Sequence, residues 1–180
     1  MIDLLIIGGG MHGTCLSHLL IRLTPLTRDD VRVLDPNDTP LAVWDFCTRN
    51  CGMRYLRSPS VHHIDLDPCA LDRFARQTAE PNPADFINPN DRPSLSLFRR
   101  HCQAVIEEQR LKEMRIKGTA LSIRNAGSHV IVDSDTECLR ARSILLAPGA
   151  AEQPRWPVWA RILRDCGAPV THIFDPSFQR

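Results

Sequence analysis

The segment Asp3 to Ser17, DLLIIGGGMHGTCLS, carries the strongest structural signal in the chain. The uninterrupted apolar run from Leu4 to Ile7 is typical of a strand that is covered on both faces in a parallel sheet. Three glycines follow with the spacing G-x-G-x-x-G, at positions 8, 10 and 13. Such a turn lets a pyrophosphate approach the backbone closely, at the positive end of the following helix. The segment therefore predicts a dinucleotide-binding strand–turn–helix unit.

A second apolar strand, from Val31 to Leu34, ends in Asp35, 22 residues after Gly13. In dinucleotide-binding folds a carboxylate at this place accepts hydrogen bonds from the adenosine ribose and repels a 2′-phosphate. Leucines between the two strands recur at three- and four-residue steps, which predicts a helix packed on the sheet: Leu16, Leu19, Leu20 and Leu23. The alternative is a merely flexible glycine turn, with Asp35 as a turn residue before Pro36. The order of strand, glycines, helix, strand and acid favours the dinucleotide site.

Length and composition restrict the other classes of function. A chain of 180 residues is enough for one well-buried domain. The net charge of +1 and the lack of a long basic run give no indication of nucleic acid or of an anionic membrane as partner. No signal peptide is evident, and no apolar run approaches the ~20 residues of a membrane span. The seven scattered cysteines do not suggest a secreted disulfide scaffold, so we expect reduced thiols in a cytoplasmic protein.

Residues 36–66 show little periodicity and predict a long functional loop. Three cysteines in or near this segment, Cys47, Cys51 and Cys69, invite a zinc interpretation, because thiolates are zinc ligands. Their spacing is loose, however, and no second tight pair completes a ligand set. Thiols without a metal are the favoured interpretation, and no metal site is predicted.

The remaining periodicity predicts helices followed by an antiparallel meander. Helices are expected over 68–77 and 94–110, separated by a proline-rich loop, 80–93, in which neither helix nor paired strand should persist. Alternating segments then predict strands over 115–117, 121–124, 129–133, 138–142 and 144–147. A helix over 158–166 and a short strand over 170–174 complete the prediction.

This order of elements closes in the motif LLAPGA, residues 145–150, and resembles the FAD-binding half of two-dinucleotide-fold flavoproteins. The loop GMRYLRSPS, residues 52–60, together with Trp44, is similar to flavin-dependent monooxygenases, above all the lysine and ornithine N-hydroxylating type. The resemblance covers most of Met1 to Ala151. In that family the closing motif is commonly Ala-Thr-Gly, whereas this chain has Pro148, which has no backbone N–H to donate.

The resemblance implies an α/β, Rossmann-like FAD/NAD(P)-binding fold, with a parallel sheet and an inserted antiparallel meander. Residues 1–150 would form this domain, and residues 151–180 a C-terminal tail leading toward a second dinucleotide fold. FAD would be the cofactor, and the resemblance assigns it these binding residues: Gly8, Gly10, His12, Gly13, Asp35, Trp44, Met53, Arg54, Ala147 and Gly149. No nucleophile with an adjacent base can be identified, so catalytic residues are not assigned.

Monooxygenases of this type use a second glycine-rich fold for NADPH, and the later glycines of this chain form no second G-x-G-x-x-G. NADPH binding would therefore need a missing domain or a partner chain. The leading hypothesis is an FAD-binding module of a flavin-dependent, monooxygenase-like oxidoreductase that is incomplete as an enzyme on its own. A non-catalytic dinucleotide-binding protein or partner subunit is the alternative, and a thiol or zinc protein is the third.

Overall fold

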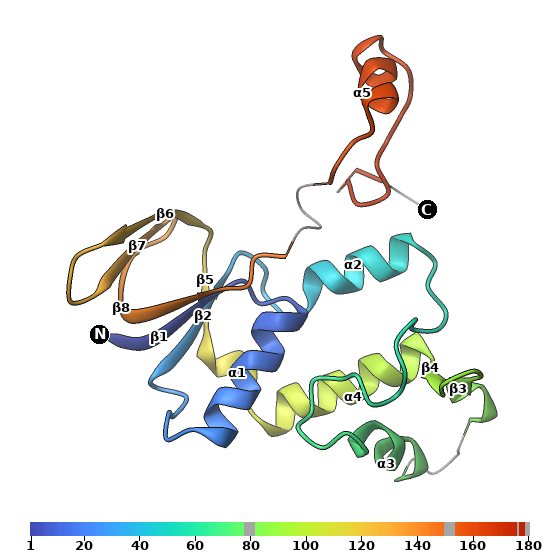
Figure 1. Cartoon of the computed structure of the whole chain (residues 1–180), viewed down its shortest axis with the longest axis horizontal. Coiled ribbons are helices and arrows are strands. Elements are labelled where there is room, and N and C mark those ends of the chain that lie inside the picture. The colour runs from blue at the N-terminus through green and yellow to red at the C-terminus, as the bar shows by residue number, and fades with distance from the viewer. Residues whose placement is uncertain (78–81, 150–153, 176, 179–180) are drawn as a thin grey trace.

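The structure is a computed structural model that describes residues 1–77, 82–149, 154–175 and 177–178. Its centre is a six-stranded sheet with the order β5-β2-β1-β8-β7-β6 (Figure 1). The strands of this sheet are β1 (Ile2–Ile7), β2 (Val31–Asp35), β5 (Arg115–Lys117), β6 (Ala120–Asn125), β7 (Val130–Ser134) and β8 (Cys138–Leu146). The first four in spatial order are parallel, and β7 and β6 continue as an antiparallel meander. This confirms the predicted Rossmann-like α/β fold.

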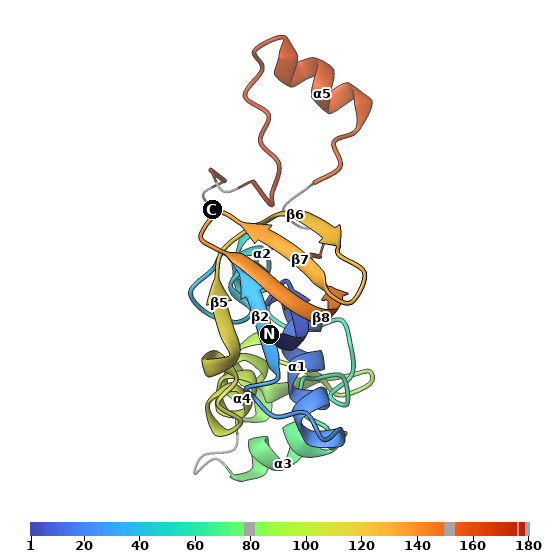
Figure 2. The ribbon, with the colours of Figure 1, turned by 90° about the vertical axis from the view of Figure 1, so that its left-hand side faces the viewer.

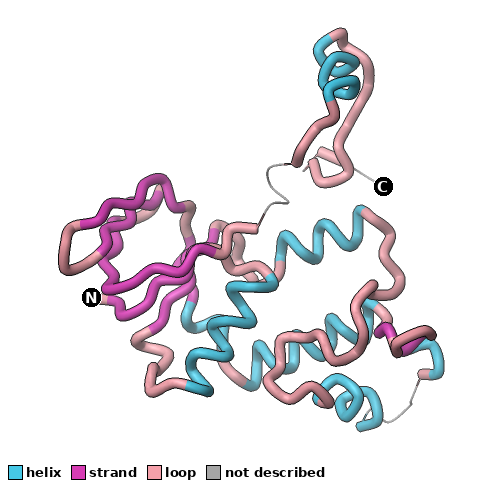
Figure 3. The backbone as a smooth tube through the Cα atoms, in the orientation of Figure 1, coloured by secondary structure: helices cyan, strands magenta, loops and turns pink. Residues whose placement is uncertain are grey.

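Most of the helices lie on one side of the six-stranded sheet, and the last helix lies apart from them (Figure 3). The helices are α1 (Met11–Leu23), α2 (Ala42–Asn50), α3 (Ala70–Gln77), α4 (Leu95–Glu108) and α5 (Val158–Asp165). Two short 3₁₀ helices, η1 (Pro83–Asp85) and η2 (Leu111–Met114), and a two-stranded hairpin, β3 (Phe86–Ile87) with β4 (Arg92–Pro93), complete the described elements.

Successive residues of β1 supply two hydrophobic cores, because neighbouring side chains of a strand point to opposite faces. Ile6 packs with Val33 and Phe98 in the larger core, beneath α1 and α4. Leu5 packs with Leu34, Val132, Leu139 and Ala141 in a smaller core, which the meander helps to cover. In Figure 2 the strands β6 and β7 continue the sheet beyond β8, which is paired with β1. Both faces of β1 are therefore covered, as its apolar run predicts.

The predicted leucine stripe of helix α1 is only partly its contact face: Leu20 packs against the larger core, but the fully buried positions belong to other residues. Its buried residues are Gly13, Thr14, Ser17 and His18, whereas Leu23 is 69% exposed. Short side chains permit close approach to β1, and their polar atoms find local acceptors. The hydroxyl of Thr14 donates to the carbonyl of Gly9 over 3.1 Å, and that of Ser17 donates to the carbonyl of Thr14 over 2.8 Å. The leucine periodicity therefore located the helix and part of its contact face, and missed the small polar residues that are fully buried.

The prediction of a long loop over residues 36–66 was wrong, because α2 lies within it and three of its residues belong to the larger core: Leu41, Leu56 and Ile64. Tertiary contacts stabilise this nine-residue helix. The Arg99 side chain donates to the Asp45 carboxylate over 2.6 Å and to the Thr48 hydroxyl over 3.2 Å. A short helix that depends on such partners has no strong local signal.

Three smaller expectations also need correction. The segment 80–93 does contain paired strands, since the β3–β4 hairpin and η1 lie in it; residues 78–81 are outside the described residues. The strands expected over 138–142 and 144–147 are one strand, β8, which continues directly from the meander into the parallel sheet. No strand occurs in the described residues 170–174. The helices expected over 68–77, 94–110 and 158–166 are confirmed with slightly shorter bounds.

A buried histidine joins α4 to the loop before α3. The His101 side chain is 3% exposed, and its Nε2 lies 3.8 Å from an Asp65 carboxylate oxygen. Its ring also contacts the rings of His63 and Phe74, with centroids 4.9 and 5.4 Å apart. Burial, reinforced by the neighbouring His63, lowers the pKa of His101 to about 4 from its ordinary value of 6.5. Between the two pKa values, His101 is therefore neutral in the folded protein and protonated in the unfolded chain.

We predict that the stability of the protein falls as the pH decreases from about 6.5 to about 4. The unfolded state binds a proton on His101 in this window and the folded state does not, which costs about 2 to 3 kcal/mol by the lower end. Urea unfolding midpoints as a function of pH measure the effect. His101→Leu should flatten the decline, and His62→Leu, which changes an exposed histidine, should not. Equal slopes for His101→Leu and the wild type would contradict the prediction.

Candidate dinucleotide-binding site

A cavity of about 480 Å³ opens at the carboxyl ends of β1, β2 and β8, beside the first turn of α1. Between β1 and β8 the chain order of the sheet reverses, and ligands of open α/β sheets bind at such switch points. The lining residues are Ile7, Gly8, Gly10, Met11, His12, Leu34, Asp35, Pro36, Val43, Trp44, Cys47, Gly118, Thr119, Ala120, Ala147, Pro148 and Gly149. The walls are thus largely apolar, with few polar groups, as in most small-molecule sites.

The three motif glycines are required for different reasons. A Cβ on Gly13 would lie 1.8 Å from the carbonyl oxygen of Gly8, so this glycine sets the close contact between α1 and β1. Gly8 has φ +107°, and a Cβ there would lie 2.3 Å from the carbonyl oxygen of Ala147. A Cβ on Gly10 would meet nothing within 4 Å, and Gly10 lines the cavity. The fold requires Gly8 and Gly13, whereas Gly10 keeps space open for a ligand.

The start of α1 fits an anion. Gly10 is its N-cap residue, no side chain caps the helix by a hydrogen bond, and its first turn contains no acidic residue. The first N–H groups of a helix have no partner within the helix, and the helix dipole favours negative charge there. With the space beside Gly10, this arrangement suits the pyrophosphate of a dinucleotide.

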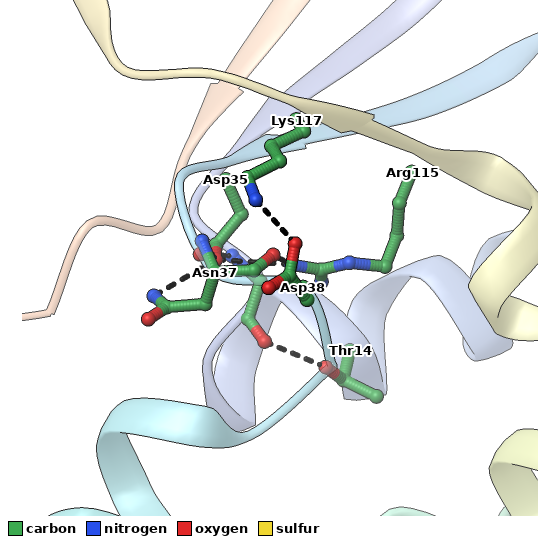
Figure 4. Close-up of polar contacts among 7 residues, drawn as sticks. Thr14, Asp35, Asn37, Asp38, Arg115 and Lys117 are labelled. Atoms are coloured by element: carbon green, nitrogen blue, oxygen red, sulfur yellow. Dashed lines mark hydrogen bonds and ion pairs between the residues drawn. The ribbon is translucent and has the colours of Figure 1, made fainter.

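Asp35 occupies the expected place at the end of β2, but its carboxylate is already engaged with the protein (Figure 4). Oδ2 accepts from the backbone N–H of Gly9 over 2.6 Å. Oδ1 accepts from the backbone and the side-chain amide of Asn37, over 2.9 and 3.1 Å, and from Nη2 of Arg115 over 3.0 Å. A carboxylate offers about four acceptor positions. A ribose hydroxyl could reach Oδ2 more readily than Oδ1, which already has three donors.

The structure brings seven of the ten predicted binding residues to the cavity: Gly8, Gly10, His12, Asp35, Trp44, Ala147 and Gly149. Gly13 is buried behind the turn rather than on the cavity wall. Met53 packs against the larger core, and Arg54 is exposed while its carbonyl accepts from Leu95 over 2.8 Å. Neither of these two residues lines the cavity.

Two parts of the wall escaped the sequence prediction. The link between β5 and β6 and the first residue of β6, together residues 118–120, contribute an edge of the cavity without a recognisable motif. Helix α2 contributes Val43 and Cys47 beside Trp44. The backbone N–H of Leu41 donates to the carbonyl of Gly9 over 3.0 Å, which ties the start of α2 to the glycine turn. This hydrogen bond, together with the contacts of Arg99 and Phe98 to α2, holds the helix beside the site.

The described residues contain no group of three histidine, cysteine or acidic side chains that could hold a metal ion. Within the same part of the chain, every helix is too short or too polar to cross a membrane.

Replacing Asp35 by Ala should destabilise the protein by roughly 3 to 5 kcal/mol, because it leaves the buried Arg115 guanidinium without its carboxylate partner. The side chains of Asp35 and Arg115 are 10% and 9% exposed. Asp38→Ala removes an acid whose ion pair with Lys117 is exposed, and it should cost less than 1 kcal/mol. Urea unfolding at neutral pH measures the free energy of unfolding of the wild type and of both variants. Similar losses for the two variants would show that the Asp35 carboxylate does not brace the turn.

Comparisons with known proteins agree with this fold. A family model described as FAD-NAD(P)-binding matches residues 5–151. No curated protein sequence matches the chain. Among solved structures, a cyclohexanone monooxygenase mutant from Rhodococcus sp. Phi1 bound to NADP⁺ is 19% identical with a TM-score of 0.58, covering 87% of this chain and 28% of its own. A bacillithiol disulfide reductase from Bacillus cereus is 15% identical with a TM-score of 0.56, covering 87% of this chain and 42% of its own.

A flavin monooxygenase mutant from Stenotrophomonas maltophilia is 17% identical with a TM-score of 0.52, covering 87% of this chain and 40% of its own. At these identities the structural matches establish a shared fold. The chain spans between 28% and 42% of the length of these three proteins. The family model covers most of the chain, from the first strand to the residues after β8. The chain therefore belongs to the FAD-NAD(P)-binding family.

Proposed function

We propose that the protein binds FAD in the cavity at the glycine turn, as the FAD-binding part of a monooxygenase-like oxidoreductase. The observation that carries the proposal is the open space at Gly10 beside the uncapped start of α1, which suits a pyrophosphate. The adenosine would lie toward Asp35 and residues 118–120 of the same cavity. The flavin ring would lie toward Trp44 and the segment from Ala147 to Gly149.

FAD supplies the redox chemistry of such enzymes, and the protein supplies binding, orientation and exclusion of water. In this chain the amides at the start of α1 would bind the pyrophosphate. His12, exposed in the first turn of α1, would lie at the edge of the same site. The indole of Trp44 is held against Phe98, with ring centroids 5.2 Å apart, and would form an oriented apolar wall for a planar ring.

A non-catalytic dinucleotide-binding subunit is the second candidate. It is favoured by the sequence, which holds one G-x-G-x-x-G motif and no second one. In either case a nicotinamide cofactor would have to be held by a further domain or by a partner chain. We place the protein in the cytoplasm, where its seven cysteines would stay reduced.

Gly10→Val should abolish FAD binding while leaving the protein folded, since valine at this N-cap position costs only about 1 kcal/mol of stability. The valine methyl groups would extend into the cavity, where nothing from the protein lies within 4 Å of the Cβ position. The visible absorption of the purified protein and a titration of apoprotein with FAD measure binding. Leu23→Val, at the exposed opposite end of α1, is the matched control and should bind normally. Full flavin occupancy in Gly10→Val would show that the pyrophosphate site lies elsewhere.

The 180-residue chain loaded with FAD should not be reduced rapidly by NADPH. Hydride transfer needs the nicotinamide held against the flavin, and such positioning supplies on the order of 7 to 11 kcal/mol of the barrier. Anaerobic mixing with NADPH, followed by the loss of flavin absorbance, measures the rate. Dithionite is the control, since it reduces flavin without a nicotinamide site. Rapid, saturable bleaching by NADPH would contradict the expectation.

A further inference from the structure

We infer that Arg115 is a positioning residue that acts through Asp35 and decides whether the site accepts an adenosine that carries a 2′-phosphate. The inference rests on the proposed function, because it concerns the adenosine end of the same cavity. It departs from the sequence expectation that the carboxylate of Asp35 by itself repels a 2′-phosphate. The structure pairs that carboxylate with a buried cation.

Arg115 is the first residue of β5, and its side chain reaches the carboxyl end of the neighbouring strand β2. Its Nη2 donates to Asp35 Oδ1 over 3.0 Å and to the carbonyl of Asn37 over 2.7 Å. Figure 4 shows the side chains of Arg115 and Asp35 directed toward one another from β5 and β2. Because an arginine stays protonated in proteins, the pair is neutral as a whole.

The guanidinium is also fitted to the glycine turn. A Cβ on Gly9 would lie 2.2 Å from Nη1 of Arg115. The G-x-G-x-x-G motif leaves position 9 open to any residue, so the motif does not explain this glycine. The place of Arg115 does explain it, since any side chain at position 9 would displace the guanidinium.

Arg115 lies behind the site rather than in it. Asp35 is on the wall of the cavity, and Arg115 is absent from the described residues that line it. With both side chains about nine-tenths buried, solvent screens this pair much less than a surface pair. A ligand at the ribose position would therefore meet an aspartate whose negative charge is largely compensated. Removing Arg115 would expose the ligand to that charge.

A neighbouring pair offers a matched control. Lys117 is two residues after Arg115 on β5, and its Nζ lies 2.5 Å from an Asp38 carboxylate oxygen. The side chains of Lys117 and Asp38 are 66% and 78% exposed, so water and salt screen their charges. If net charge alone affected binding of the 2′-phosphate, removing the charge of Lys117 would have the same effect as removing that of Arg115. The inferred mechanism predicts an effect for Arg115 and none for Lys117.

The test compares dissociation constants, by calorimetry on the full chain, for ADP and for ADP that carries a 2′-phosphate. We expect the wild type to bind the two probes within about tenfold of each other. Arg115→Met should weaken binding of the 2′-phosphorylated probe at least tenfold more than binding of ADP. Gly9→Ala, which displaces the guanidinium, should change the ratio in the same direction. Lys117→Met should leave the ratio within about twofold of the wild type.

A double variant distinguishes an effect of the Arg115 charge from a purely structural effect of the Arg115 side chain. Asp35→Asn combined with Arg115→Met removes both charges and should restore the wild-type ratio, even if both affinities fall. Arg115→Lys keeps the charge and should keep the ratio. Equal losses for both probes in Arg115→Met and in Gly9→Ala, or a larger change of ratio in Lys117→Met, would overturn the inference. Absence of binding of FAD and of both probes to the wild type would instead refute the proposed function.

Discussion

The close contact between helix α1 and strand β1 is the constraint on which the rest of the structure depends. It exists because Gly13 has no Cβ, which would otherwise lie 1.8 Å from the carbonyl oxygen of Gly8. The contact buries small polar residues of α1, and it directs the uncapped start of the helix at the space in front of the sheet. The position of the helix start at the cavity follows from this one contact.

A second layer of interactions holds the turn in place from neighbouring elements. Asp35 accepts from Gly9, Leu41 donates to Gly9, and the guanidinium of Arg115 lies against the same glycine. The end of β2, the start of α2 and the distant strand β5 thereby converge on one residue that the motif leaves unspecified. Asp35 therefore acts first as a structural ligand of the turn. Any contact to a ribose would be added to that role.

Under the role that we infer for Arg115, this arrangement links stability to ligand selection. A buried aspartate without its arginine would be costly, and so would the arginine without its aspartate. Variants at either position will therefore affect folding as well as binding, and a binding ratio distinguishes the two effects better than a single affinity does. The fold tolerates the buried pair because four further hydrogen bonds satisfy its polar atoms. The Asp35 carboxylate accepts three of them, from the backbone N–H of Gly9 and from the backbone and side-chain amides of Asn37. The Arg115 guanidinium donates the fourth to the carbonyl of Asn37.

The sequence alone determined the local features: the apolar run of β1, the spacing of the motif glycines, the acid at the end of β2 and the alternation of the meander. These depend on neighbours in the chain, and each has a strong periodic or conformational signature. Only the tertiary structure decided that α2 exists, that Met53 and Arg54 lie outside the cavity, and that Arg115 backs Asp35. Those features rest on contacts between segments as many as 80 residues apart, for which the chain carries no local signal.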